Sequence, residues 1–126
     1  MNWITWVLIF TGVGLNAAAQ LALKVATRPL AAYAQFDGAT LMASIFVLAR
    51  SGAFWVGMFC YGASLCVWLA ALARAPVSIA YPMLSIGYVI VAFASMLWLG
   101  ETLSPAKMLG IALICMGVVL VSRSAA

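Results

Sequence analysis

The chain is 126 residues long, is 68% hydrophobic and only 6% charged, and carries a formal net charge of +4. A soluble domain needs a hydrated surface with about a quarter of its residues charged, so this composition excludes an ordinary soluble fold. The basic residues form no cluster, which excludes a nucleic-acid partner and favours contact with anionic lipid head groups. The length fits one compact domain.

The first apolar segment, 3–23, contains no charged residue and is long enough to cross the hydrocarbon core of a bilayer. No basic residue precedes it, and Trp3 and Trp6 are typical of interfacial anchors, so we expect a retained helix rather than a signal peptide. A more polar loop follows at 24–52, with Pro29 ending the helix nearby. Its apolar run 39–49 is too short to span and predicts an interfacial helix.

Three further apolar segments are predicted to cross the membrane, at 54–73, 77–99 and 105–121. Pro82 lies inside the second of these, where it predicts a kink and leaves a backbone carbonyl unpaired. Ser104 is placed to cap the last helix, with Pro105 at its first position. The predicted fold is therefore an all-α membrane protein, a bundle of four transmembrane helices in a single domain.

The charged residues lie between these spans rather than inside them. Both carboxylates, Asp37 and Glu101, fall outside the apolar segments. Four basic residues flank the first and third loops and two flank the other side of the membrane: Lys24, Arg28, Arg50 and Lys107 against Arg74 and Arg123. Because basic loops stay in the cytoplasm, this bias predicts a cytoplasmic first loop with both termini outside.

The first span carries a polar stripe, since Asn16, Gln20 and Lys24 follow one another at four-residue spacing. Asn16 lies near mid-membrane, where an unpaired amide costs several kcal/mol, so the stripe must face protein or a wet cavity. Hydrogen bonds that hold helices together are one interpretation, and the lining of a transport pathway is the other. Lys24 either extends to the membrane interface or, with Arg28, holds an anionic head group.

Aromatic and polar side chains share a face in the second and third spans: Tyr61, Ser64 and Trp68 in one, Tyr81, Ser85 and Tyr88 in the other. Packing explains such faces, but buried tyrosine hydroxyls need partners, which suits a polar cavity. The candidate substrate-binding residues are Asn16, Gln20, Lys24, Arg28, Tyr61, Trp68, Tyr81, Ser85 and Tyr88.

Gly110 and Gly117 lie on one face of the last span, and they indicate either a dimerisation surface or internal packing. The chain has no histidine, and its cysteines form no metal-binding pattern, so we expect no metal and no cofactor. No residue pattern suggests a nucleophile with its base, so we expect no catalytic residues and no enzymatic activity.

Several motifs resemble the small multidrug resistance family of the drug–metabolite transporter superfamily: CYGAS at 60–64, RAPVSIAY at 74–81 and GIALICMGV at 110–118. A closer resemblance is to the branch of undecaprenyl-phosphate aminoarabinose flippase subunits, in AAAQLALK at 17–24, IAYPMLS at 79–85 and GETLSP at 100–105. The resemblance covers nearly the whole chain except the enlarged first loop.

This resemblance implies a four-helix subunit that works as a dimer held by its fourth helices. Drug antiporters of the family keep a titratable glutamate in the first helix, and the alignment of motifs puts Asn16 at that position. Their cation-stacking tryptophan of the third helix corresponds to Leu84. An amide cannot exchange protons, so both departures point away from a drug pump and toward the lipid-carrier branch.

The leading hypothesis is therefore a flippase, or flippase subunit, of the bacterial inner membrane that moves an undecaprenyl-phosphate-linked sugar such as aminoarabinose. Its expected partners are membrane lipid and a similar four-helix subunit, in a homo- or heterodimer. The alternative is a small multidrug resistance-type exporter of cationic drugs or polyamines that forms half of a heterodimer. A third hypothesis is a non-transporting assembly subunit, whose polar stripe only holds helices together.

Overall fold

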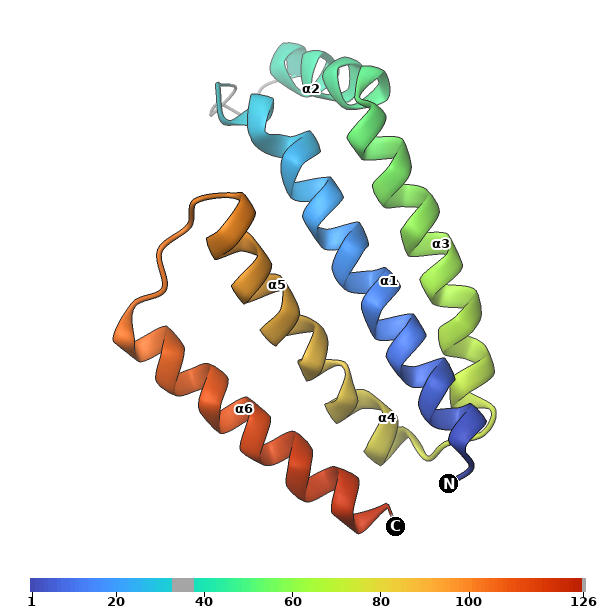
Figure 1. The fold of residues 1–126 in the computed structure, drawn as a ribbon. Coiled ribbons are helices and arrows are strands. Elements are labelled where there is room, and N and C mark those ends of the chain that lie inside the picture. The colour runs from blue at the N-terminus through green and yellow to red at the C-terminus, as the bar shows by residue number, and fades with distance from the viewer. Residues whose placement is uncertain (33–37, 126) are drawn as a thin grey trace.

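A computed structural model describes residues 1–32 and 38–125, and every regular element in these ranges is a helix (Figure 1). In chain order the elements are α1 (Trp3–Thr27), the short 3₁₀ helix η1 (Arg28–Ala32), α2 (Gly38–Arg50), α3 (Gly52–Leu72), α4 (Val77–Met83), α5 (Ser85–Trp98) and α6 (Pro105–Ser124). Asp37 lies outside the described residues.

Four helical segments are long and apolar enough to cross a membrane: Trp3–Ala31, Gly52–Leu72, Val77–Trp98 and Pro105–Ser124. The predicted all-α fold with four transmembrane helices is confirmed. The first helix continues to Thr27, beyond the predicted span 3–23. Lys24 then lies in its last turn, where a cation interacts favourably with the helix dipole, and Pro29 follows within η1.

Local sequence explains where the helices break and begin. Pro82 cannot donate a backbone hydrogen bond, and the third span is interrupted at Leu84 between α4 and α5, as the predicted kink requires. The Ser104 side chain accepts a hydrogen bond from the Lys107 amide at 3.3 Å, which confirms the predicted cap of α6. Ser51 caps α3 in the same way, by accepting from the Phe54 amide at 3.4 Å.

The helix α1 lies between α3 on one side and α4 and α5 on the other, and α6 packs on α4 and α5 (Figure 1). Gly57 of α3 allows a close approach to α1, because a Cβ there would lie 2.9 Å from Leu23 Cγ. The buried core gathers toward the end that carries both termini: Ile9, Val13, Trp68, Ala71, Ala75, Ala80 and Met83. The ends of α1 and α5 point toward the opposite end of the bundle, where Arg28 is hydrogen-bonded to the Leu99 carbonyl (Figure 1).

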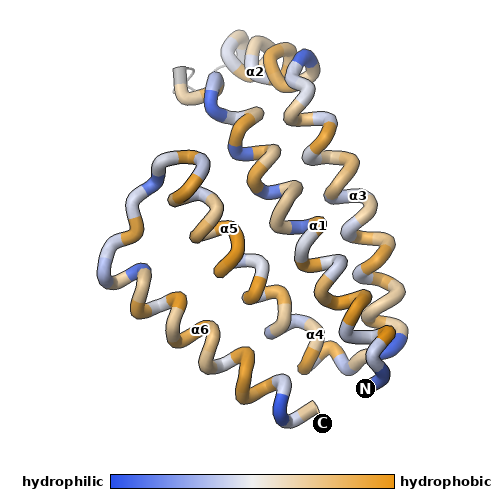
Figure 2. The backbone as a smooth tube through the Cα atoms, viewed as in Figure 1, coloured by the Kyte–Doolittle hydropathy of each residue, from blue (hydrophilic) through white to orange (hydrophobic). Residues whose placement is uncertain are grey.

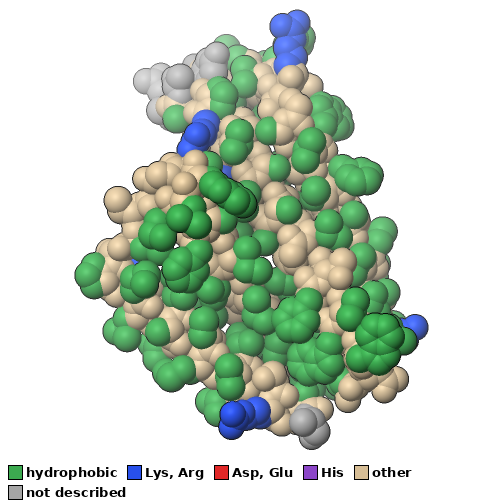
Figure 3. All heavy atoms as spheres, in the orientation of Figure 1, with side chains coloured by type: hydrophobic (Ala, Val, Ile, Leu, Met, Phe, Trp, Pro, Cys, Tyr) green, Lys and Arg blue, Asp and Glu red, His purple; other side chains and the backbone are tan. Residues whose placement is uncertain are grey.

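The outer surface is that of a protein immersed in lipid. Hydrophobic side chains cover the middle of the face shown in Figure 3, and basic side chains appear toward its two ends. Hydrophilic positions recur along α1, whereas α6 is hydrophobic along most of its length (Figure 2). No residue of α6 is buried by the rest of the described chain.

Candidate functional site

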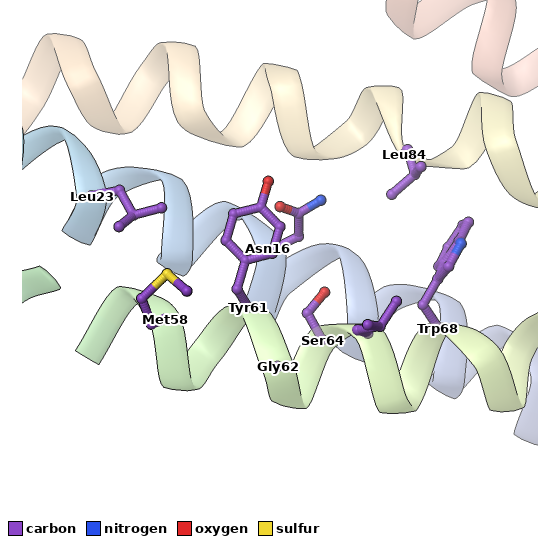
Figure 4. A pocket seen from close by; sticks show the side chains of 9 residues that line it. Asn16, Leu23, Met58, Tyr61, Gly62, Ser64, Trp68 and Leu84 are labelled. Atoms are coloured by element: carbon purple, nitrogen blue, oxygen red, sulfur yellow. The ribbon is translucent and has the colours of Figure 1, made fainter. Parts of the chain in front are cut away.

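A groove of about 560 Å³ lies where α1, α3 and the α4–α5 break meet. Its walls are mainly apolar: Asn16, Leu23, Met58, Tyr61, Gly62, Ser64, Leu65, Trp68 and Leu84 line it (Figure 4). Met58, Tyr61 and Leu65 are exposed, so they mark its open side. Because these residues belong to the spans, that side faces lipid. The groove can therefore receive an apolar chain laterally, with a few polar groups at its inner wall.

Asn16 provides the most unusual polar group of this inner wall. Its side-chain oxygen Oδ1 is buried and has no hydrogen-bond partner within the described part of the chain. A buried acceptor without a donor costs about 1–3 kcal/mol, and such groups are rare in native proteins. A ligand hydroxyl or ammonium group would satisfy it.

The polar stripe predicted in α1 continues from Asn16 toward the loop end. Asn16 and Leu84 also border a smaller pocket of about 30 Å³, which Gln20 and Tyr88 line as well. The Gln20 amide nitrogen donates a hydrogen bond to the Tyr61 hydroxyl at 2.8 Å, which links α1 to α3 beside the groove. Gln20 lines both this smaller pocket and a third pocket further along the stripe.

This third pocket, of about 260 Å³, lies at the end of the stripe between α1, α5 and the loop after α5. Its lining contains Gln20, Lys24, Ser95 and Glu101. The Lys24 ammonium lies 3.6 Å from Glu101 Oε1, and the two side chains are 56% and 45% exposed. We call these side chains the rim pair. Arg28 donates to the backbone carbonyl of Leu99 at 3.2 Å, which brings a second cation to the same rim.

Glu101 is a site residue that sequence reasoning placed only outside the spans. The signal was available, because loops separated by two membrane crossings lie on the same side. Glu101 and the end of α1 therefore had to share one end of the bundle. Gly100, with φ of 69°, takes a left-handed conformation that glycine adopts easily and turns the chain toward that end.

The aromatic and serine candidates divide between the groove and its surroundings. Trp68 is almost fully buried and meets Tyr81 edge to face, with ring centroids 5.9 Å apart. Ser64, which shares the helix face of Tyr61 and Trp68, donates to the backbone carbonyl of Gly12 at 2.9 Å and lines the groove. Tyr88 is 67% exposed beside the smallest pocket. Ser85 lines none of these three pockets.

The two glycines predicted to support a dimer face away from the core of the subunit. Gly117 is exposed and Gly110 half-buried, and a Cβ at either position would have no neighbour within 4 Å. Neither glycine is therefore needed for packing within the described chain. The surface they form is open to another helix.

Comparison with known proteins agrees with this architecture, since residues 4–123 match the EamA-like transporter family. The chain is 32% identical over 122 residues to a protein of Pseudomonas savastanoi pv. phaseolicola named probable 4-amino-4-deoxy-L-arabinose-phosphoundecaprenol flippase subunit ArnE, covering 97% of this chain and 100% of that one. A Salmonella newport protein of the same name is 35% identical, over 88% of this chain and 90% of its own.

A probable ArnF subunit of the same flippase type, from Shewanella sediminis, is 48% identical, but only over 67 residues, which are 52% of this chain and 46% of that protein. No solved structure matches the chain. The match to the family and the end-to-end similarity to the ArnE protein agree with the resemblance seen in the motifs. The chain is a multi-pass membrane protein and belongs to the EamA-like transporter family.

Proposed function

We propose that the chain is a subunit of a flippase that carries an undecaprenyl-phosphate-linked amino sugar across the bacterial inner membrane. The names of the relatives that match the chain from end to end support this cargo. The observation that carries the proposal is the geometry of the polar stripe. Asn16, Gln20 and Lys24 connect a lipid-facing groove to a charged rim through adjoining pockets.

The groove suits a cargo with a polar head and a long apolar tail. The polyprenyl tail stays in lipid at the open side, beside Met58 and Leu65, while the head group moves along the stripe. Lys24 and Arg28 attract the phosphate by charge-assisted hydrogen bonds, and Asn16 offers its unpaired oxygen to a sugar hydroxyl. No covalent bond changes, so transport requires no catalytic residue.

The proposal includes a second four-helix subunit, in a homo- or heterodimer. A single groove that is open to lipid on one side shields only part of a head group, and desolvating a charged group in lipid is costly. A second subunit would cover more of the head group while the apolar tail still reaches lipid. The exposed, apolar α6 with Gly110 and Gly117 is the surface we assign to this contact.

The orientation completes the proposal. The rim pair and Arg28 lie at the end that the distribution of basic residues places in the cytoplasm. We assign α2 to the head-group region on that side, because its exposed side chains Leu41, Met42, Ile45 and Phe46 form an apolar face. The cargo head would then meet basic residues before it enters the stripe.

Flux measurements in vesicles test the proposed function. The chain, with any partner subunit that co-purifies, is reconstituted with a polyprenyl-phosphate-linked amino sugar, and a membrane-impermeant amine reagent reports the head groups exposed outside. The double variant Lys24→Ala with Asn16→Ala is expected to lower the translocation rate at least about tenfold, because it removes a charge-assisted contact worth about 1.5–3 kcal/mol.

The matched control is Arg123→Ala, which removes an exposed basic residue at the opposite end of the bundle. This variant is expected to keep the wild-type rate. Wild-type flux in the double variant would show that the stripe is not the transport path.

The alternative exporter of cationic drugs or polyamines is favoured by one observation. Trp68 lines the groove and pairs edge to face with Tyr81, and aromatic side chains attract organic cations. No carboxylate lines the groove within the described residues, so a partner subunit would have to supply it. Proton release when a quaternary ammonium compound is added to the purified complex would support this alternative, and its absence would argue against it.

A further inference from the structure

The rim pair joins two distant parts of the chain above the pocket that ends the polar stripe. Lys24 comes from the last turn of α1, and Glu101 comes from the loop between α5 and α6. Their charged atoms are 3.6 Å apart, and about half of each side chain is exposed. Gln20 and Ser95 line the pocket below them. An anionic and a cationic group therefore lie side by side at the entrance to the proposed path.

The fold does not depend on this ion pair. Exposed ion pairs contribute little to stability, because water screens both charges. The loop is held by other bonds: the Glu101 amide donates to the Ser95 carbonyl at 3.2 Å, and Lys107 donates to the Thr102 carbonyl at 3.4 Å. Arg28 adds its bond to the Leu99 carbonyl. The two charges can therefore separate without releasing the loop.

We propose that the rim pair is a two-point receptor for a zwitterionic head group, in which Lys24 binds a phosphate and Glu101 binds the ammonium group of an amino sugar. This assignment rests on the proposed function and names the chemical feature that the site selects. The ligand exchanges one internal ion pair for two external ones. Every charge keeps a partner, so the head group is accepted with little electrostatic cost.

The same arrangement discriminates against a phosphate-linked sugar without a free amine. The phosphate of such a ligand would still bind Lys24. Glu101 would then have no cationic partner at the mouth of a partly apolar pocket. The site therefore discriminates in two ways. The amino sugar gains an attraction to Glu101, and the ligand without an amine leaves the Glu101 carboxylate unpaired.

Equilibrium binding tests the receptor separately from transport. Calorimetric titration of the purified complex in detergent micelles uses two ligands, a short-chain polyprenyl phosphate linked to 4-amino-4-deoxyarabinose and its N-acetylated analogue, which lacks the positive charge. The wild-type protein is expected to bind the free amine about tenfold more tightly. Glu101→Gln is expected to abolish this preference. Lys24→Gln is expected to lower the affinity for both ligands.

Two further variants separate ligand binding from loop structure. Lys107→Gln removes the other lysine of this loop region and is expected to keep the preference. The exchanged pair Lys24→Glu with Glu101→Lys retains an ion pair but reverses its direction, and it is expected to bind both ligands weakly, because the phosphate would then meet a carboxylate on the stripe.

The outcomes distinguish the receptor from the proposed function. Equal affinities for the two ligands in the wild-type protein, or a preference that survives Glu101→Gln, would overturn the receptor even if the vesicles show flux. A preference that depends on Glu101 in a protein that shows no flux would overturn transport and leave the receptor standing. If the exchanged pair fully recovered the preference for the free amine, the rim pair would have only a structural role.

Discussion

The helices α1 and α6 are both apolar enough to span a membrane, yet they differ in how many of their residues are buried within the subunit. The helix α1 carries the polar stripe and contributes seven buried positions: Thr5, Ile9, Gly12, Val13, Ala17, Ala19 and Ala26. The helix α6 contributes no buried position in the described chain. Five of these seven residues are small, which lets neighbouring helices approach closely, whereas lipid solvates large apolar side chains as well as a protein core does.

The glycines show the same contrast at closer range. At Gly57 a Cβ would meet Leu23 Cγ at 2.9 Å and the Ala19 carbonyl oxygen at 3.3 Å, so α1 and α3 are already in full contact. At Gly110 and Gly117 of α6 a Cβ would meet nothing. One seam is complete within the subunit, and the other surface is left for a neighbour.

The largest effect is expected where the completed seam is broken. Gly57→Val would force α1 away from α3, because the backbone of Ala19 cannot move aside as a side chain can. Overpacking of this kind costs typically about 1–3 kcal/mol, and we expect about 2 kcal/mol here. The midpoint of unfolding by sodium dodecyl sulfate in mixed micelles measures it.

Gly62→Val is the matched control on the same helix, since a Cβ at Gly62 has no neighbour within 4 Å. It is expected to leave the midpoint unchanged. Equal losses in the two variants would mean that helix propensity, and not the close α1–α3 contact, sets the stability of this seam.

A smaller effect of opposite sign is expected at Asn16. Replacing its unpaired, buried oxygen by an apolar side chain in Asn16→Leu should raise the free energy of unfolding by about 1 kcal/mol, because a desolvated acceptor is removed. Flux should fall in the same variant. Stability in micelles and flux in vesicles, measured on the same preparation, test both signs.

The Asn16 result also separates the transport hypothesis from the assembly hypothesis. If the amide only holds helices together, Asn16→Leu should loosen the subunit and lower the unfolding midpoint. Lower stability with unchanged flux would therefore contradict the role we assign to Asn16 and favour a non-transporting subunit.

Most of the fold follows from the sequence, because each apolar run can be compared with the thickness of a bilayer and each break has a local cause. Pro82 interrupts the third span, and Ser104 with Pro105 starts the last one. Neither requires knowledge of any tertiary contact. The extension of α1 to Thr27 was less evident, since Lys24 is a poor residue for the lipid core but a good one for a helix end.

The site follows from the sequence only in part. Four-residue spacing places Asn16, Gln20 and Lys24 on one face, but it does not say which helix that face meets. The bond from Gln20 to Tyr61 and the contact of Lys24 with Glu101 depend on how the helices pack. Periodicity also grouped Ser85 with Tyr81 and Tyr88, although the kink at Leu84 alters the register between α4 and α5.

The smallest effect on the subunit itself is expected on the open surface of α6. Gly117→Leu should change the free energy of unfolding by less than about 0.5 kcal/mol, because the new side chain meets no atom of its own subunit. The dissociation constant of the proposed dimer should nevertheless rise about tenfold, since the bulkier residue keeps a second helix at a distance. Light scattering across a dilution series measures this dissociation constant.

The control is Gly14→Leu, at an exposed and equally open position of α1, which should leave the dimer intact. If both variants dimerise as the wild type does, the open face of α6 is covered by lipid, and the second subunit must contact another surface.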